Sequence, residues 1–334
     1  MRNIFVTLFL ILSFNFSITS QEKLKIVASA SMLQDIASRV IGSDHDISMI
    51  VPIGGDPHLH EPTPSNARLV ADADLILING LTFEGWINEL IDNSGTGGTV
   101  VTVTQGIDVL GSQVYQNSTD PHAWMDASNG IIYARNIRDA IVELSPANAS
   151  KYNANFTKYE KELRKLDEEI TSAISTIPEK RRILITSHDA FQYYGRRYGI
   201  RLEAIMGIST EAEAQTADII RVNKVIRENK VPAVFIESTI NPKMIQQLAT
   251  DNNVKIGGSL YADSLGDKDS PAATYIEMLR YNTKTIVTAL SGASIENHGQ
   301  THDSNPSGTN WKMLGLIFGL LLTITAIVVI KLNR

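Results

Sequence analysis

Residues 148–176 read NASKYNANFTKYEKELRKLDEEITSAIST, and this stretch decides how the rest of the chain is interpreted. Apolar residues recur in it at steps of three and four with charged residues between them, which is the pattern of an amphipathic helix. They are Tyr152, Phe156, Tyr159, Leu163, Leu166, Ile170 and Ile174. The helix would be on the order of 40 Å long, as long as a whole domain. We therefore predict a rigid connecting helix, with a coiled-coil segment as the alternative.

On both sides of this helix, short apolar runs alternate with amphipathic stretches, a pattern typical of parallel sheets flanked by helices. Before it, strands are expected at residues 24–28, 47–51, 75–78 and 100–104, and helices at 32–41, 65–71, 83–91 and 127–144. After it, strands are expected at 182–186, 233–237 and 254–257, and helices at 190–198, 211–229, 242–249 and 271–290. The predicted fold is α/β, with two lobes at residues 21–146 and 178–290 joined by the linking helix at 147–177.

Both ends of the chain carry apolar segments. Residues 1–20 have the arginine, apolar run and small polar residues of a secretory signal peptide, with an uncleaved anchor as the alternative. Residues 313–330 contain no charge and are long enough to span a bilayer core. We predict a flexible tether at 291–310, a transmembrane helix at 311–331 and a cytoplasmic tail at 332–334. The folded part would then lie outside the cytoplasmic membrane, in a periplasmic or extracellular location.

The composition is that of a folded globular protein. The chain has 334 residues, is 43% hydrophobic and carries a net charge of −6, so nucleic acid is not an expected partner. It contains no cysteine. Disulfides, thiolate metal ligands and anchoring through a lipidated cysteine are therefore excluded, and any metal site must use His, Asp or Glu. We expect a monomer.

The tripeptide Asp-Pro-His occurs twice, in GGDPHLHEP at residues 54–62 and in DPHAWMD at residues 120–126. Proline fixes its own φ and pushes the preceding residue towards an extended conformation. Each motif therefore holds its histidine on a stiff loop, which suits a residue that must present a ring nitrogen in one direction. We predict that His58 and His122 are metal ligands, with loop-capping histidines as the alternative.

Two further candidates lie just after expected strands of the second half of the chain. His188 follows the strand at 182–186, and Asp263 follows the strand at 254–257. Open α/β sheets bind their ligands at the carboxyl ends of the strands, which favours both residues as part of a site. A hydrogen-bonded pair of His188 with Asp189, and a turn aspartate at Asp263, are the structural alternatives.

These motifs together resemble those of the substrate-binding proteins of bacterial ABC transporters for zinc, manganese and iron. The resemblance covers about residues 24–290. It rests on GGDPHLHEP at 54–62, DPHAWMD at 120–126, SHDAFQYY at 187–194, FIES at 235–238 and LYADSLG at 260–266. It implies two α/β lobes joined by one long helix, and ligation of the metal by His58, His122, His188 and Asp263. It also implies a membrane permease as partner, with no catalytic residues.

Three imidazoles and one carboxylate can bind divalent zinc or manganese, and imidazole nitrogen favours zinc. Manganese members of the family often carry Glu where this chain has His188, which also favours Zn²⁺ over Mn²⁺. Many zinc members have a long His-rich loop before the second ligand, but residues 111–119 contain no histidine, and this argues against zinc. His298 and His302 are interpreted as part of a solvated linker, with weak metal collection as the alternative.

Other residues near the motifs are given supporting roles. His60 would point away from the ion in an extended chain, and His45 is expected on the surface. Glu61 and Asp126 are candidates to orient the ligand rings, because ligating histidines usually donate their other N–H to an oxygen. The aromatic candidates to shield the site from water are Tyr115, Trp124 and Tyr261, with ordinary core packing as the alternative. A zinc-dependent hydrolase and a metal-stabilised surface adhesin remain the competing functions.

Overall fold

The computed structural model describes residues 23–111, 119–211 and 214–292, all of which belong to one compact unit that ends at Ala293. The expected signal peptide, tether and transmembrane helix, and Tyr115, lie outside the described residues. Within those described ranges, no helix combines the length and the apolar character that crossing a bilayer requires.

The first half of the chain forms the N-lobe, built on a four-stranded parallel sheet. The strand order is β2 (Asp46–Met49), β1 (Lys25–Ala28), β3 (Leu75–Ile78) and β4 (Thr99–Thr102). The two central strands are almost wholly apolar and buried, as strands covered on both faces must be. Helices α1 (Ser31–Ile41) and α4 (Ala127–Leu144) pack on one face, and α2 (Pro64–Ala71) and α3 (Ile87–Ser94) on the other.

The second half forms the C-lobe, in which two pairs of parallel strands lie side by side. The strands are β5 (Ile183–Thr186), β6 (Arg201–Ala204), β7 (Ala233–Glu237) and β8 (Lys255–Leu260). The helices are α6 (Gln192–Tyr198), α7 (Thr216–Asn229), α8 (Lys243–Asn252) and α9 (Tyr275–Leu290). The sequence interpretation omitted β6, because this strand carries two charged residues in four and shows no apolar run.

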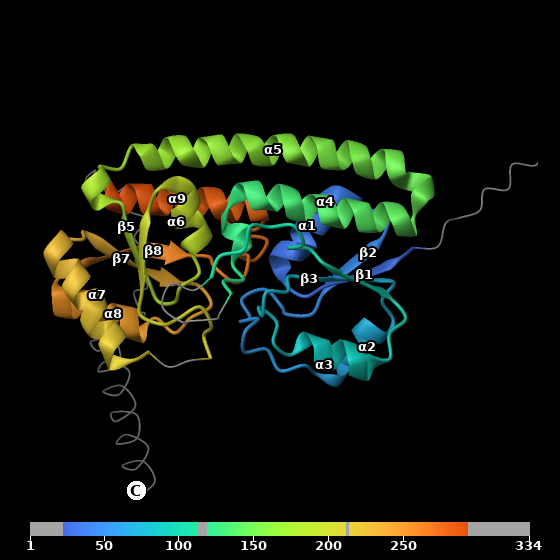
Figure 1. The fold of residues 1–334 in the computed structure, drawn as a ribbon, viewed down its shortest axis with the longest axis horizontal. Coiled ribbons are helices and arrows are strands. Elements are labelled where there is room, and N and C mark those ends of the chain that lie inside the picture. The colour runs from blue at the N-terminus through green and yellow to red at the C-terminus, as the bar shows by residue number, and fades with distance from the viewer. Residues whose placement is uncertain (1–22, 112–118, 212–213, 293–334) are drawn as a thin grey trace, which may run out of the picture. The chain divides into compact units, whose positions relative to one another are not determined.

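The long helix is α5 (Ala149–Ser175), and all seven residues of the predicted apolar face are buried. It packs on α1 and α4 of the N-lobe and on α6 and α9 of the C-lobe, so that one continuous helix lies along both lobes (Figure 1). The parallel α/β architecture expected from the sequence is confirmed.

Three helices begin four or more residues later than predicted, and one of them is the helix expected at 271–290, which begins at Tyr275 after its N-cap Thr274. The helix expected at 83–91 begins at Ile87, and residues 83–86 form turns that precede it. The helix expected at 211–229 begins at Thr216. Phe83 and Trp86 continue the apolar spacing of α3 into the turns that precede this helix.

His45 is buried, with 6% of its surface exposed, and the expectation that it lies on the surface was wrong. Its Nδ1 accepts a hydrogen bond from the backbone N–H of Leu24 at 3.0 Å, and its Nε2 lies 2.8 Å from the hydroxyl of Tyr152 on α5. Because Nδ1 is an acceptor, the neutral ring carries its proton on Nε2 and donates it to Tyr152. This histidine therefore attaches the edge of the N-lobe sheet to the long helix as a neutral group.

We expect a measurable loss of stability at acidic pH from His45. Burial lowers the pKa of His45 below its ordinary value, whereas in the unfolded chain the pKa is about 6.5. The neutral ring therefore stabilises the fold above about pH 6.5, and this contribution falls as the pH drops towards the folded-state pKa. The loss is about 1.4 kcal/mol for each unit of pKa difference. Urea unfolding of metal-free protein at pH 7.5 and pH 5.5 measures it. The variant His45→Gln should show a smaller loss, and an equal loss in both proteins would contradict the assignment.

Candidate metal centre

The two Asp-Pro-His motifs form the same kind of turn. In each, the aspartate side chain accepts a hydrogen bond from the backbone N–H of the histidine two residues later, at 2.9 Å from Asp56 to His58 and at 2.9 Å from Asp120 to His122. Such side-chain turns are typical of aspartate, and the intervening proline stiffens them. We call residues 54–62 the first ligand loop and residues 120–126 the second ligand loop.

The structure brings together all four residues expected to bind metal. Donor atoms of His58, His122, His188 and Asp263 lie within 4.8 Å of one another, and all four side chains are buried. The first two come from loops of the N-lobe. His188 follows β5 and Asp263 follows β8, at the carboxyl ends of strands in the C-lobe. The cluster therefore lies between the lobes, where sequence-distant loops meet.

The second ligand loop fixes the direction of the His122 ring. The Asp120 carboxylate lies 2.7 Å from Nδ1 of His122, so Nδ1 carries the donated proton and Nε2 faces the cluster. That Nε2 lies 3.3 Å from Nε2 of His58. Two lone pairs facing each other at this distance repel, so a proton or a cation between the two nitrogens would stabilise the arrangement.

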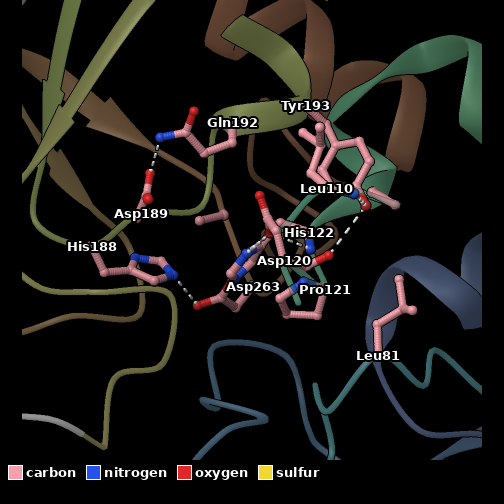
Figure 2. A network of polar contacts seen from close by, with 12 residues as sticks. Leu81, Leu110, Asp120, Pro121, His122, His188, Asp189, Gln192, Tyr193 and Asp263 are labelled. Atoms are coloured by element: carbon pink, nitrogen blue, oxygen red, sulfur yellow. Dashed lines mark hydrogen bonds and ion pairs between the residues drawn. The ribbon is translucent and has the colours of Figure 1, made fainter. Parts of the chain in front are cut away.

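The C-lobe half of the cluster has a parallel arrangement. Nδ1 of His188 lies 2.6 Å from a carboxylate oxygen of Glu237, whose other oxygen accepts a hydrogen bond from the His188 backbone N–H at 2.8 Å. Nε2 of His188 lies 3.1 Å from Asp263, and Figure 2 shows the ring pointing at that carboxylate. Despite these short distances, the ring nitrogens of His188 and both oxygens of Asp263 make no hydrogen bond of acceptable geometry. Buried acceptors of this kind are costly unless a cation or a donor satisfies them.

The charges of the cluster are tightly coupled. Burial lowers the pKa of His58 to about 3. Burial also disfavours the charged form of His122, but the carboxylates of Asp120 and Asp263 outweigh it and raise the pKa of His122 to about 9. At Asp263, burial favours the neutral form, but the facing His188 and His122 lower its pKa well below the ordinary range. The cluster thus contains a charged carboxylate facing nitrogen donors, which is an attractive environment for a cation.

Contacts between the lobes border the cluster. The backbone N–H of Gly54 donates to the Ser264 hydroxyl at 2.7 Å, and the Thr210 hydroxyl donates to Asp56 at 2.7 Å. The indole of Trp124 donates to the carbonyl of Ala262 at 3.0 Å. The two ligand loops are therefore attached to the C-lobe segments on the other side of the site.

Several supporting roles expected from the sequence are not the ones the structure shows. Asp126 caps helix α4 by accepting from the backbone N–H of Ser128 at 2.8 Å, and Glu61 is exposed, so neither orients a ligand ring. His60 stacks on Trp86 with ring centroids 4.8 Å apart and lies outside the cluster, as expected.

The aromatic residues expected to shield the site differ in what they contact. Trp124 is fully buried and packs with its ring centroid 5.3 Å from that of His122, so it borders the site. Tyr261 is partly buried and packs on Tyr281 of α9.

The residues that orient the rings are Asp120 and Glu237, and the sequence reasoning missed both in this role. Asp120 belongs to the repeated tripeptide, in which the aspartate side chain accepts a hydrogen bond from the backbone N–H of the histidine. That local turn chemistry is a signal that could have identified it. Glu237 ends β7 and meets His188 only through the folding of two neighbouring strands, so no local signal exists for it.

A buried cluster of imidazoles and one carboxylate between two α/β lobes defines the class of two-lobed metal-binding proteins. The chain belongs to the family described as ZnuA, zinc-uptake complex component A periplasmic, whose model matches residues 26–289. The resemblance seen in the sequence motifs is thereby confirmed.

Individual relatives agree with this assignment. The chain is 38% identical over 270 residues to the manganese-binding lipoprotein MntA of Halalkalibacterium halodurans, which covers 81% of this chain and 89% of that protein. It is 33% identical to the manganese ABC transporter substrate-binding lipoprotein PsaA of Streptococcus anginosus, over 82% of this chain and 91% of that protein. The solved periplasmic zinc-binding protein TroA of Treponema pallidum superposes with a TM-score of 0.77 at 31% identity, covering 81% of this chain and 100% of that one.

Proposed function

We propose that this protein captures a divalent transition-metal ion outside the cytoplasmic membrane and delivers it to the permease of an ABC transporter. The observation that carries the proposal is the cluster of four buried side chains whose donor atoms converge without hydrogen-bond partners for Asp263. Membership of a metal-uptake family and the names of the relatives support the same activity.

In this proposal, the ligands are one ring nitrogen each of His58, His122 and His188 and the carboxylate of Asp263. Such a set gives a divalent ion three neutral donors and one negative charge, so the ion together with its ligands has a net charge of about +1. The site is buried between the lobes, so the ion is separated from water. Release to the permease then requires that the loops of the two lobes move apart.

We propose that zinc binds more tightly than manganese. Three imidazoles favour zinc over manganese on donor type, and the general order of affinities for divalent metals also places zinc higher. The relatives include proteins named for manganese as well as one named for zinc, so both ions are reasonable cargo.

Competition titration tests the function and the preference together. Protein purified without added metal is titrated with zinc and with manganese against a chromophoric chelator. We expect one equivalent of either ion to bind, with zinc at least tenfold tighter because of the imidazole donors. Absence of binding by both ions would contradict metal capture, and tighter manganese binding would contradict only the preference.

Membrane attachment is proposed to differ from that of the relatives named lipoproteins. No cysteine occurs in the 334 residues, so lipid attachment to a cysteine is not available to this chain. We propose that residues 1–20 direct secretion and that residues 311–331 anchor the protein in the membrane. Fractionation of cells that produce the chain with and without residues 311–331 tests this anchor, and an equal membrane-bound fraction of both forms would contradict it.

A further inference from the structure

Among the three histidines of the site, His58 is the one whose ring no carboxylate orients. The ring of His122 has Asp120 at 2.7 Å and the ring of His188 has Glu237 at 2.6 Å. In the ranges that the structure describes, no carboxylate lies within ion-pair distance of a His58 ring nitrogen. Nε2 of His58 lies 3.3 Å from that of His122, and the rest of the ring is left to packing contacts.

Phe83 supplies such a contact. It is fully buried, and its ring meets the ring of His58 edge to face, with centroids 5.0 Å apart and planes at 85°. The same ring lies 6.1 Å from that of His122 and 4.6 Å from that of Trp124. Aromatic rings prefer this geometry because the positive edge of one faces the negative face of the other. Phe83 thus borders two of the four candidate ligands and holds one of them by packing.

An unusual backbone conformation leads into Phe83. Gly80, Leu81 and Thr82 have φ angles of 74°, 55° and 66°, a run of three residues in the left-handed region. This conformation is unfavourable for residues with a Cβ, and most of all for a β-branched threonine. The other two non-glycine residues with positive φ among the described residues, Lys230 and Asn253, end helices, where the conformation is usual. No helix ends at residues 80–82.

Buried hydrogen bonds hold this turn in place. The carboxylate of Glu84 accepts from the backbone N–H groups of Asn79 and Gly80, at 2.8 and 3.0 Å, and from the Ser29 hydroxyl. The side chain of Asn79 donates to the carbonyl of Pro121 at 3.0 Å, so the turn is attached to the second ligand loop. Backbone strain of this kind persists where the surroundings over-determine the conformation, and it is concentrated at functional sites.

We propose that residues 79–84 form a preset frame in which Phe83 is a positioning residue that holds the ring of His58 in its metal-binding orientation. The inference rests on the proposed metal capture, and Phe83 itself does not touch the ion. A regular helix beginning at residue 83, the one expected from the sequence, would give this side chain a different direction. The strained turn is what places the ring against the first ligand loop.

The variant Phe83→Leu tests this role, because leucine fills much of the same space without a flat ring edge. We expect zinc affinity, measured by chelator competition, to fall by about tenfold to a hundredfold, the range typical when a contact that orients a ligand is lost. Cobalt(II) absorption should also change in position or intensity, because it reports the geometry of the ligands. Circular dichroism of the metal-free protein should stay the same. If Phe83→Leu does not fold, the unbranched Phe83→Met carries the same test.

Phe156→Leu is the matched control. It removes a buried ring from α5 that packs beneath the guanidinium of Arg138, away from the site, and it should leave zinc affinity and the cobalt spectrum unchanged. Zinc affinity and a cobalt spectrum of Phe83→Leu equal to those of the unchanged protein would overturn the positioning role. Failure of the unchanged protein to bind zinc, manganese or cobalt would instead overturn the proposed function.

Discussion

Replacing Asp263 by alanine is expected to weaken zinc binding by more than about a hundredfold, beyond the loss that follows removal of an orienting contact. Asp263 is the anionic member of the four candidate ligands, and its two oxygens lie 3.4 and 3.1 Å from Nε2 of His122 and His188. The substitution therefore removes a donor and the negative charge that attracts the ion. Chelator competition with the purified variant measures the change, and circular dichroism checks that the fold remains.

Asp269→Ala is the control for this experiment, because Asp269 is an exposed aspartate further along the same segment. It should bind zinc as the unchanged protein does.

The zinc affinity of Asp263→Ala also separates the competing functions. A zinc hydrolase uses three histidines and leaves a position open for water, so it would keep its zinc in Asp263→Ala and lose turnover. Retention of unchanged affinity in this variant would contradict the carrier assignment.

The sequence predicted the parts of the fold that depend on local periodicity. The apolar face of α5 was visible because seven buried side chains recur at helical spacing, and the central strands because they are continuous apolar runs. What it could not predict depends on contacts between distant residues. Strand β6 carries Arg201 and Glu203, and Glu203 pairs with both Arg201 and Arg221 of α7, so the place of this strand in the sheet is decided by tertiary packing.

The candidate ligands of the N-lobe were easier to predict from the sequence than those of the C-lobe. His58 and His122 share a motif whose turn chemistry is local, and these residues can be identified from the sequence alone. His188 and Asp263 have no local signal beyond following a strand, and the family resemblance singled them out. The helix was expected to start at Phe83, directly after the left-handed turn at residues 80–82, because apolar spacing does not reveal the backbone conformation. Glu237 was not assigned because its partner lies on a neighbouring strand.

Replacing Glu237 by glutamine is expected to weaken zinc binding by about tenfold to a hundredfold, although the residue does not touch the ion. Its two carboxylate oxygens face two nitrogens of His188, the backbone N–H at 2.8 Å and Nδ1 at 2.6 Å. A glutamine has only one oxygen to place against these two nitrogens. Its amide N–H₂ would face Nδ1 and favour the tautomer with the proton on Nε2, the nitrogen that points at Asp263. The nitrogen needed for the metal would then be protonated. Chelator competition of Glu237→Gln against the unchanged protein measures the loss.

A buried carboxylate elsewhere in the same lobe provides the comparison. Glu203 on β6 is also buried but pairs with Arg201 and Arg221, and it takes no part in the cluster. Glu203→Gln should lower thermal stability, because it weakens the pairing of a buried carboxylate with two partly exposed arginines, and should leave zinc affinity unchanged. For Glu237→Gln we expect the reverse result. Its zinc affinity should fall clearly, and its thermal stability should change less. If both variants lost stability alone, Glu237 would be a structural residue, and the direction of the His188 ring would have to come from its packing.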